Sequence, residues 1–382
     1  MNCCHSPRRR IASNLMLMDG KLISRPLLEI DNQGTILSVA TYSQVDRLQF
    51  TEFYSGIITP GFVNAHCHLE LSYLQGRIPP YQGFAAFARA IGEVRGEASE
   101  QERRRAITSA DIKLRNEGVV AVGDILNGTT SMDCKEASPV RYRNFGELFG
   151  LRTTSVESMA WVEEYANSSI TPHSIYSLND AVFREIATRD VSSPLSIHFM
   201  ESPAEAELYE RRGRLWDWYE SVGFECDFLH YGSPAERIVQ SVPSDRSVIL
   251  VHNCCVTQPD IDIIMSHFTA PVYWALCPCS NDYISHLAPP VELLRKNDLN
   301  ICIGTDSLAS NESVSMMREM LRIADVPLGE LLDWATRQGA QSLGFDDLGR
   351  IEVGRRPGIN VISGIDYKSM SLTTGSQVLK LI

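Results

Sequence analysis

The chain has 382 residues, 44% of them hydrophobic, which is enough for one large domain with a small additional one. With 35 basic and 47 acidic residues its formal net charge is −12, which disfavours binding to the phosphate backbone of nucleic acids. No secretory apolar stretch follows Arg8-Arg9-Arg10, and no run approaches the roughly 18 apolar residues of a membrane span. These features predict a cytoplasmic protein with a small-molecule partner and no nucleic-acid or membrane partner.

The chain contains 10 cysteines, which we expect to be reduced thiols because no export signal is apparent. Two close groups stand out, Cys254-Cys255 and Cys277-Pro278-Cys279. Neither group has the C-x-x-C spacing of structural zinc sites. We therefore expect these cysteines to pack in the core or to form part of a pocket wall.

Residues 10–56 contain short strand-like runs that polar turns interrupt. The turn residues Asp19-Gly20 and Asn32-Gln33-Gly34 are typical of β-hairpins. The C-terminal tail has the same character around residues 349–354 and 360–362. We predict one small β-sandwich domain built from both termini, residues 1–56 and 346–382, beside a main domain of residues 57–345.

Within the main domain, eight β-rich apolar runs alternate with helical stretches. The predicted strands are 57–65, 119–126, 145–151, 170–177, 195–200, 248–252, 272–277 and 300–304. Helices are predicted at 84–95, 102–115, 180–188, 203–219, 259–267 (with Thr257 as its N-cap) and 311–324. Eight strands that alternate with helices over about 290 residues fit an α/β fold, a (β/α)8 TIM barrel.

His66 and His68 lie at the end of the first predicted barrel strand, in the stretch ITPGFVNAHCHLELS. Side chains two residues apart on a strand share one face, with Cβ atoms about 6.5 Å apart, so both imidazoles can reach one ion at about 2.1 Å. The alternative is that both histidines line a polar barrel interior without a metal. The remaining chemistry-bearing residues decide between these interpretations.

Four further polar residues stand at predicted strand ends. They are His198 and Glu201 at the fifth strand, His252 at the sixth and Asp306 at the eighth. The C-terminal ends of all barrel strands face one rim, so these residues are expected to meet His66 and His68 there. Glu147, at the end of the third strand, either faces the same rim or lies away from it.

The expected roles follow from the ligand types. His66, His68, His198 and Asp306 form a ligand set for one divalent ion, most simply zinc, with iron or manganese also compatible. Such an ion lowers the pKa of a bound water toward 7 and supplies hydroxide at neutral pH. Glu201 is not needed as a ligand and is the expected proton shuttle.

Alternatives stay open for two of these residues. Glu201 could instead be a surface N-cap before Pro203. His252 is either a fifth ligand or the group that hydrogen-bonds the hydroxide, and we favour the second role. His5, His230, His267 and His286 are treated as ordinary histidines, and Trp216, Trp218 and Tyr219 as core or subunit-contact residues.

As a set, the motifs TPGFVNAHCHLELS, HFMES, VHN, CPCSN and GTDSLASN resemble the metal-dependent amidohydrolase superfamily. The similarity lies in the branch of aromatic-amine deaminases and triazine hydrolases and covers nearly the whole chain. No lysine stands at the end of the fourth strand, where binuclear relatives carry one, so the resemblance implies a single metal ion. His173 in TPHSIYS occupies that place and resembles a substrate-contacting histidine of adenosine-type deaminases.

Within this branch, HCHLELS and HFMESPAEAELYE are most similar to aminofutalosine deaminases. The resemblance implies that Glu70 contacts a ring nitrogen or sugar hydroxyl of the substrate, and that Ser307 also belongs to the substrate-binding residues. It also suggests a homodimer.

The predicted function is a mononuclear metal-dependent hydrolase that deaminates an aminated purine or purine-nucleoside derivative. Hydroxide on the metal attacks a ring carbon, Glu201 and Asp306 move protons, and ammonia leaves. One alternative keeps the same site but hydrolyses a cyclic amide or a chlorotriazine-type substrate. A more distant alternative is a catalytically silent scaffold.

Overall fold

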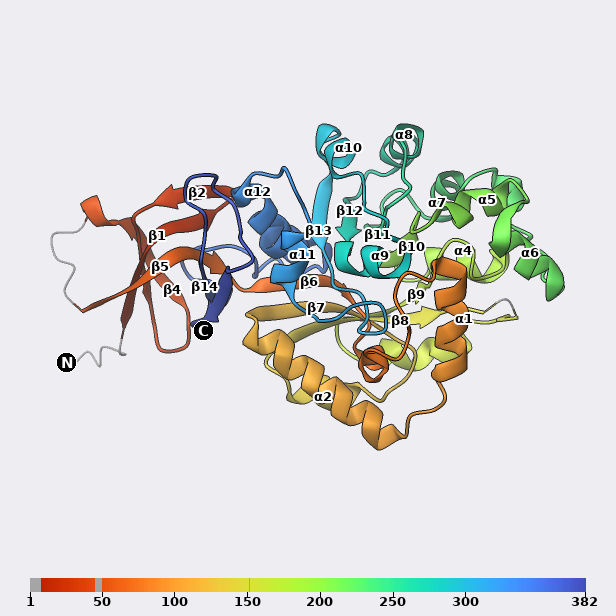
Figure 1. Ribbon diagram of the computed structural model, residues 1–382, viewed down its shortest axis with the longest axis horizontal. Helices are drawn as coiled ribbons and strands as arrows, with labels where there is room; N and C mark the ends of the chain where they lie inside the picture. The colour runs from red at the N-terminus through yellow and green to blue at the C-terminus, as the bar shows by residue number, and fades with distance from the viewer. Residues whose placement is uncertain (1–7, 45–49, 151) are drawn as a thin grey trace.

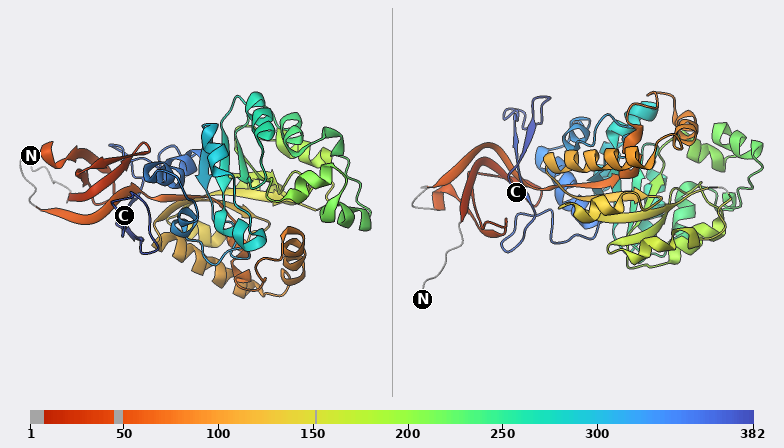
Figure 2. Two further views of the ribbon diagram at one scale, coloured as in Figure 1. Left: turned by 45° about the horizontal axis from the view of Figure 1, so that its top comes forward. Right: turned by 90° about the horizontal axis from the view of Figure 1, so that it is seen from below.

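The computed structural model describes residues 8–44, 50–150 and 152–382 of the chain. The N-terminal strands and the end of the chain form one β-rich part at one end of the molecule, and the parallel strands and most helices form the rest (Figure 1). Two further views show the same division (Figure 2). One continuous stretch of extended chain, Thr51–Cys67, leads from the first part into the second.

The β-rich part is a sheet of seven strands in the order β15-β14-β5-β1-β3-β4, with β2 paired to β1. Its strands are β1 Arg9–Met18, β2 Lys21–Ser24, β3 Pro26–Ile30, β4 Ile36–Thr41, β5 Thr51–Pro60, β14 Ile359–Ser363 and β15 Gln377–Lys380. Only the β1–β5 pair is parallel. The sheet therefore combines strands from the N-terminal region with strands from the end of the chain.

Both predicted hairpin turns are confirmed. Asp19 and Gly20 have φ values of 46° and 74°, as a two-residue turn between antiparallel strands requires, and Met18 pairs with Lys21 across it. The second turn joins β3 to β4, and the carboxylate of Asp31 accepts the backbone N–H groups of Gln33 and Thr35 there. Local turn chemistry thus fixes the register of both hairpins.

The larger part contains two four-stranded parallel sheets. The first consists of β6 Phe62–Cys67, β7 Val119–Leu126, β8 Arg141–Leu148 and β9 Ser168–Pro172, in that order. The second consists of β10 Leu195–Phe199, β11 Val248–His252, β12 Val272–Leu276 and β13 Asn300–Ile303. Almost every residue of these strands is buried, which is why they are apolar runs rather than alternating patterns.

Two isolated parallel bridges join the two sheets at their C-terminal ends. Ser174, just after β9, pairs with His198 of β10. Cys67 of β6 pairs with Asp306, just after β13. The C-terminal ends of the first and last strands therefore lie side by side, and so do those of the fourth and fifth.

Helices connect and cover the parallel strands (Figure 1). Those of four residues or more are α1 Phe84–Val94, α2 Glu100–Asn116, α3 Met132–Ala137, α4 Asp180–Thr188, α5 Pro203–Tyr209, α6 Gly213–Ser221, α7 Pro234–Ser241, α8 Gln258–His267, α9 Pro278–Ser285, α10 Val291–Lys296, α11 Met316–Leu321, α12 Leu328–Asp333 and α13 Gly339–Ser342. Short 3₁₀ segments occur at Tyr42–Gln44, Leu69–Leu74, Glu157–Glu164 and Leu229–Tyr231, and a π-helical turn at Trp334–Gln338. Within the described residues, no helix combines the length and apolar character needed to cross a bilayer.

All eight predicted barrel strands occur; Val119–Leu126 and Val248–His252 have the predicted ends, and the other six have shifted ends. The run 57–65 is two strands, because Ile57–Pro60 completes β5 in the terminal sheet and β6 begins after Gly61. The third strand begins at Arg141 and ends at Leu148, and its predicted last residue, Leu151, lies outside the described residues. Thr257 caps α8 as predicted, through a capping box with Asp260.

Two helix predictions were too long. The predicted helix 203–219 is interrupted after Tyr209, where Gly213 has a φ of 85° and starts α6 in a new direction. The predicted helix 311–324 is helical only from Met316 to Leu321, because Asn311 and its neighbours instead hydrogen-bond to the loop after β13.

Candidate functional site

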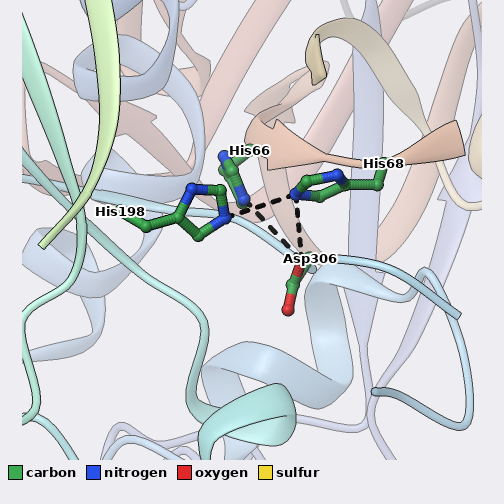
Figure 3. Close-up of side chains that lie close together, drawn as sticks. All are labelled: His66, His68, His198 and Asp306. Carbon is green, nitrogen blue, oxygen red and sulfur yellow. Dashed lines mark hydrogen bonds and ion pairs between the residues drawn. The ribbon is translucent and has the colours of Figure 1, made fainter. Parts of the chain in front are cut away.

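Four side chains from three strand ends converge in the larger part of the molecule (Figure 3). His66 and His68 come from the end of β6, His198 from β10, and Asp306 from the residues after β13. All four are buried, and their potential ligand atoms lie within 4.8 Å of one another. The structure therefore brings together the four residues that the sequence predicted as metal ligands.

The spacing of these atoms suits shared coordination of one ion. The Nε2 atoms of His68 and His198 are 3.3 Å apart, and Asp306 Oδ1 lies 3.5 Å from His68 Nε2 and 3.7 Å from His66 Nε2. Ligand atoms at about 2.0–2.1 Å from an ion lie about 3.3–3.4 Å apart at the corners of a tetrahedron. Neither ring nitrogen of His66 has a hydrogen-bond partner, although both are buried. Buried polar atoms need partners, and an ion at this place would supply one.

The protonation states also fit a metal site. Burial lowers the pKa of His68 to about 4, and burial together with neighbouring imidazoles lowers that of His198 well below its usual value. Burial alone would raise the pKa of Asp306, but the surrounding imidazoles hold it well below its usual range. Neutral imidazoles and a carboxylate are the forms that bind divalent ions.

Two serines hold the Asp306 carboxylate in place. Ser280 and Ser310 donate hydrogen bonds to Oδ2 at 2.6 and 2.8 Å, which leaves Oδ1 turned toward the histidines. Ser307, predicted as a substrate contact, lies next to them and its hydroxyl is 3.1 Å from that of Ser310. The roles of Ser280 and Ser310 were not predicted, although both lie in the motifs CPCSN and GTDSLASN.

Close packing of β6 against β13 places His66 beside Asp306. The backbone N–H groups of Thr305 and Asp306 both donate to the His66 carbonyl at 3.0 Å, and the buried Asn64 side chain bonds Thr305. A Cβ on Gly304 would lie 2.8 Å from the Cβ of His66, so only glycine fits at this crossing. Asp306 itself has a φ of 55°, a strained value that recurs at functional sites.

Glu201 lies at the same rim and is buried, not a surface N-cap. Ser202 is the N-cap residue of α5, so that alternative is wrong. Burial, with Asp306 and Glu205 nearby, raises the pKa of Glu201 well above its usual value. A carboxyl group perturbed in this way beside a candidate metal site is typical of general acid–base catalysts.

Glu205 fixes the backbone that carries Glu201. Its fully buried carboxylate accepts the N–H groups of Met200 and Glu201 at 2.8 and 2.7 Å. Met200 has a φ of 50°, so these two hydrogen bonds stabilise a turn that is unfavourable for a non-glycine residue. This role of Glu205 was not predicted.

Glu205→Gln is expected to lower the free energy of unfolding by about 1–3 kcal/mol, because an amide NH₂ group cannot accept the second backbone N–H. Urea denaturation would measure this change. Glu207→Gln, on the same helix and paired with exposed Arg212, is the matched control and should have almost no effect. Equal stability of the Glu205 variant and wild type would contradict the assigned role.

His252 is fully buried beside Glu201. Asn281 Nδ2 lies 2.9 Å from its Nδ1, while its Nε2 has no hydrogen-bond partner and lies 3.9 Å from the Glu201 carboxylate. Burial lowers the pKa of His252 to about 3. Its ring centroid is 5.2 Å from that of His198, yet it is not part of the four-residue ligand group.

The predicted substrate contacts Glu70 and His173 lie on one hydrogen-bonded network. Glu70 accepts the backbone N–H of Asn127 at 2.6 Å, and burial raises the pKa of Glu70 to about 7. Asn127 Nδ2 donates to Glu147, whose Oε1 lies 2.6 Å from His173 Nδ1. Glu147 therefore faces this network, which decides the question that the sequence left open. Asn127 was not predicted as a site residue.

The remaining cysteines and histidines lie outside the ligand group. Cys277 is buried in the core beside β12, while Cys254, Cys255 and Cys279 are partly buried free thiols. Among the described residues, no group able to hold a metal includes a cysteine. His230 and His267 lie beside backbone carbonyls, and His286 stacks on Tyr81. Tyr219 belongs to the hydrophobic core, and the partly buried Trp216 packs against that core, whereas Trp218 is exposed. His5 lies outside the described residues.

A family model described as the amidohydrolase family matches residues 57–378. The chain belongs to this family. It is 26% identical over 331 residues to the adenosine deaminase of Helicobacter pylori. The aligned region covers 81% of this chain and 79% of that protein. The resemblance predicted from the motifs is confirmed.

Solved structures show the same fold. The aminofutalosine deaminase of H. pylori, in complex with methylthio-coformycin, matches with a TM-score of 0.80 at 23% identity, covering 93% of this chain and 92% of that one. The atrazine chlorohydrolase of Arthrobacter aurescens, complexed with zinc, matches with a TM-score of 0.76 at 18% identity, covering 97% and 95%. Family membership and deaminase relatives support an enzyme that hydrolyses carbon–nitrogen bonds.

Proposed function

We propose that the chain is a mononuclear metal-dependent hydrolase that deaminates an aminated purine or purine-nucleoside derivative, such as aminofutalosine. The observation that carries this proposal is the convergence of His66, His68, His198 and Asp306 at one buried point, with Glu201 beside them. The similarity to an adenosine deaminase and to an aminofutalosine deaminase supports the choice of substrate class.

The proposed architecture is a (β/α)8 barrel with a small β-sandwich domain. The bridges Cys67–Asp306 and Ser174–His198 would close the two parallel sheets into one ring of eight strands. Residues 1–56 and 346–382 would form the small domain and residues 57–345 the hydrolase domain. The continuous strand region Thr51–Cys67 would link them.

The four converging residues would hold one divalent ion, with zinc the first choice because a zinc complex is known for a structural relative, and iron or manganese compatible with the same donors. When bound, such an ion supplies Lewis acidity that brings the pKa of a water toward 7. The two serines on Asp306 Oδ2 would keep Oδ1 in its place as a ligand.

Glu201 would take a proton from the attacking water and deliver it to the amino nitrogen that leaves as ammonia. Asp306 would assist by taking the proton of the newly attached hydroxyl group and passing it to the ring nitrogen of the product as the carbonyl forms. His252, held through Nδ1 by Asn281, would use its unpartnered Nε2 to orient the attacking oxygen. Burial of all three side chains excludes bulk water from the proton transfers.

Glu70, His173 and Ser307 are the proposed substrate contacts. Glu70 and His173 lie on one network after strands of the first sheet, and Ser307 follows β13 of the second sheet. A planar ring between them would meet polar groups along its edges. The proposed partner is thus a small molecule, and a cytoplasmic location and a homodimer stay predictions.

Purified protein should release ammonia from at least one member of a panel of adenosine, its 5′-substituted derivatives, aminofutalosine and pterins, followed in a coupled ammonia assay. The second candidate function, hydrolysis of a chlorotriazine-type substrate, is favoured by the similarity to atrazine chlorohydrolase. It predicts chloride release from atrazine without ammonia. Absence of ammonia from every purine and pterin tested would overturn the deaminase proposal.

Removal of the metal should abolish activity reversibly. Treatment with a chelator is expected to lower metal content from about one equivalent per chain to almost none and to stop ammonia release, because the ligand set holds a single ion. One equivalent of zinc, iron or manganese should restore it. A chain that carries well under one equivalent and gains no activity from any of these ions would instead be a silent scaffold.

A further inference from the structure

Glu147 is a buried carboxylate that the proposed chemistry does not use. It lies near the C-terminal end of β8, and only 4% of its surface is exposed. Its Oε1 lies 2.6 Å from Nδ1 of His173, the first residue after β9. Because a carboxylate can only accept, the His173 Nδ1 atom carries the proton in this contact.

Asn127 fixes the second oxygen of this carboxylate. Its side-chain NH₂ donates to the backbone carbonyl of Glu147 at 2.9 Å and to Oε2 at 3.2 Å. The Asn127 side-chain oxygen accepts from Arg95, and its backbone N–H donates to Glu70. The carboxylate thus has little freedom to rotate, and one residue connects it to a second proposed substrate contact.

His173 is held on two sides but left open on a third. Its ring lies against that of His198, with centroids 4.3 Å apart, and Phe149 approaches it edge-on. Its Nε2 has no hydrogen-bond partner among the described residues, and 28% of the side chain is exposed. The ring therefore has one nitrogen engaged by the protein and one available to a ligand.

We propose that Glu147 is a positioning residue, which holds His173 through Nδ1 so that Nε2 is presented to the substrate. The inference rests on the proposed function, because it takes His173 as a substrate contact. Without Glu147, the imidazole could rotate about its Cβ–Cγ bond and move its proton to the other nitrogen. Substrate would then bind to a mixture of ring orientations and tautomers.

The same residues do not form an independent second metal site. Glu147, His173 and His198 lie close enough together to suggest one. However, Nδ1 of His198 lies 2.8 Å from the backbone carbonyl of His173 and donates to it, so only its Nε2 can bind a metal. That Nε2 belongs to the four-residue group. Glu147 is therefore assigned to His173 rather than to an ion.

Kinetics of Glu147→Ala, Glu147→Gln, His173→Ala and the double alanine variant test the proposal. Glu147→Ala is expected to raise KM about 10–100-fold with kcat within a few-fold of wild type, the effect of losing one oriented hydrogen bond to substrate. Glu147→Gln should fall between wild type and Glu147→Ala, since its amide oxygen still accepts from Nδ1 but its NH₂ group cannot accept from Asn127. The double variant should be no worse than His173→Ala alone.

The matched control is Asp333→Ala, which removes another buried carboxylate, paired with Arg337 on a helix beside the terminal sheet. It should leave KM unchanged. If the rise in KM of the double variant equalled the product of the two single-variant rises, Glu147 would act independently of His173. That result would overturn the proposal. Metal loss from Glu147→Ala would also overturn it.

A second readout does not depend on the reaction. In ¹⁵N-labelled protein, the His173 ring should show a proton on Nδ1 in wild type and in Glu147→Gln, but a mixture of tautomers in Glu147→Ala. A wild type with this signature that releases no ammonia from any purine would refute the deaminase proposal and not the positioning role. An unchanged His173 spectrum in Glu147→Ala would refute the positioning role.

Discussion

Glu201→Gln is expected to lower turnover about 10²–10⁴-fold, the usual size of a general acid–base contribution. Glutamine has nearly the same shape but cannot take up and release the proton that moves from water to the leaving nitrogen. Glu201 is not among the four converging ligand residues, so the variant should retain about one equivalent of metal per chain. The measurement is kcat for ammonia release, together with metal content by mass spectrometry.

The matched control for this prediction is Glu207→Gln. Glu207 lies on the helix that follows Glu201, where it pairs with Arg212 at the surface. Its replacement makes the same carboxyl-to-amide change at the surface and should leave kcat unchanged. Wild-type turnover in Glu201→Gln would remove Glu201 from the mechanism, and equal loss in both variants would point to a general charge effect.

The candidate ligand set could be predicted because it depends on a rule of the fold. In parallel βα units the C-terminal ends of the strands lie at one edge, so polar residues at those positions meet even when they are far apart in sequence. His66 and Asp306 are 240 positions apart, and their side chains lie within 3.7 Å. The alternation of strands with helices predicted the fold, and the histidines and aspartate at the strand ends predicted the ligands.

The residues that support the ligands carry no such signal. Ser280, Ser310 and Asn127 act through side-chain angles and loop paths that depend on how neighbouring segments pack. Glu205 could not be predicted for a different reason. A glutamate in the first turn of a helix is common and usually faces solvent. Its burial becomes apparent only when the backbone of Met200 turns toward it.

Strand and helix ends were less predictable than the elements themselves. The run 57–65 is apolar throughout, so composition gives no sign that the chain leaves one sheet at Pro60 and enters another at Phe62. The break is set at Gly61, where a Cβ would lie 2.2 Å from a methyl group of Val120. Tertiary contact, not local preference, decides this boundary.

His66→Ala is expected to remove the metal and, with it, all measurable activity. His66 supplies one of four converging atoms, and both of its ring nitrogens are buried without a hydrogen-bond partner. Without an ion, both of these buried nitrogens would lack a hydrogen bond, so His66 is the ligand whose removal should affect the metal most directly. Metal content should fall from about one equivalent to well below it.

Thermal unfolding gives an independent test of the same change. Binding to the folded state alone stabilises a protein by about 2.7 kcal/mol when the free ligand is at 100 times its Kd. Added zinc should therefore raise the Tm of chelated wild type but not that of His66→Ala. His267→Ala is the matched control, because His267 lies on α8 with its Nε2 beside the Val242 carbonyl, away from the ligand group.

The His267→Ala control should bind about one equivalent of metal, and added zinc should raise its Tm after chelation, as it does for wild type. A His66→Ala variant that still bound one equivalent and still rose in Tm would show that the ion lies elsewhere. In that case His68, His198 and Asp306 would need another reason to lie so close together, because His68 Nε2 lies 3.3 Å from His198 Nε2 and 3.5 Å from Asp306 Oδ1. The stability measurement thus tests the site directly, whatever the substrate proves to be.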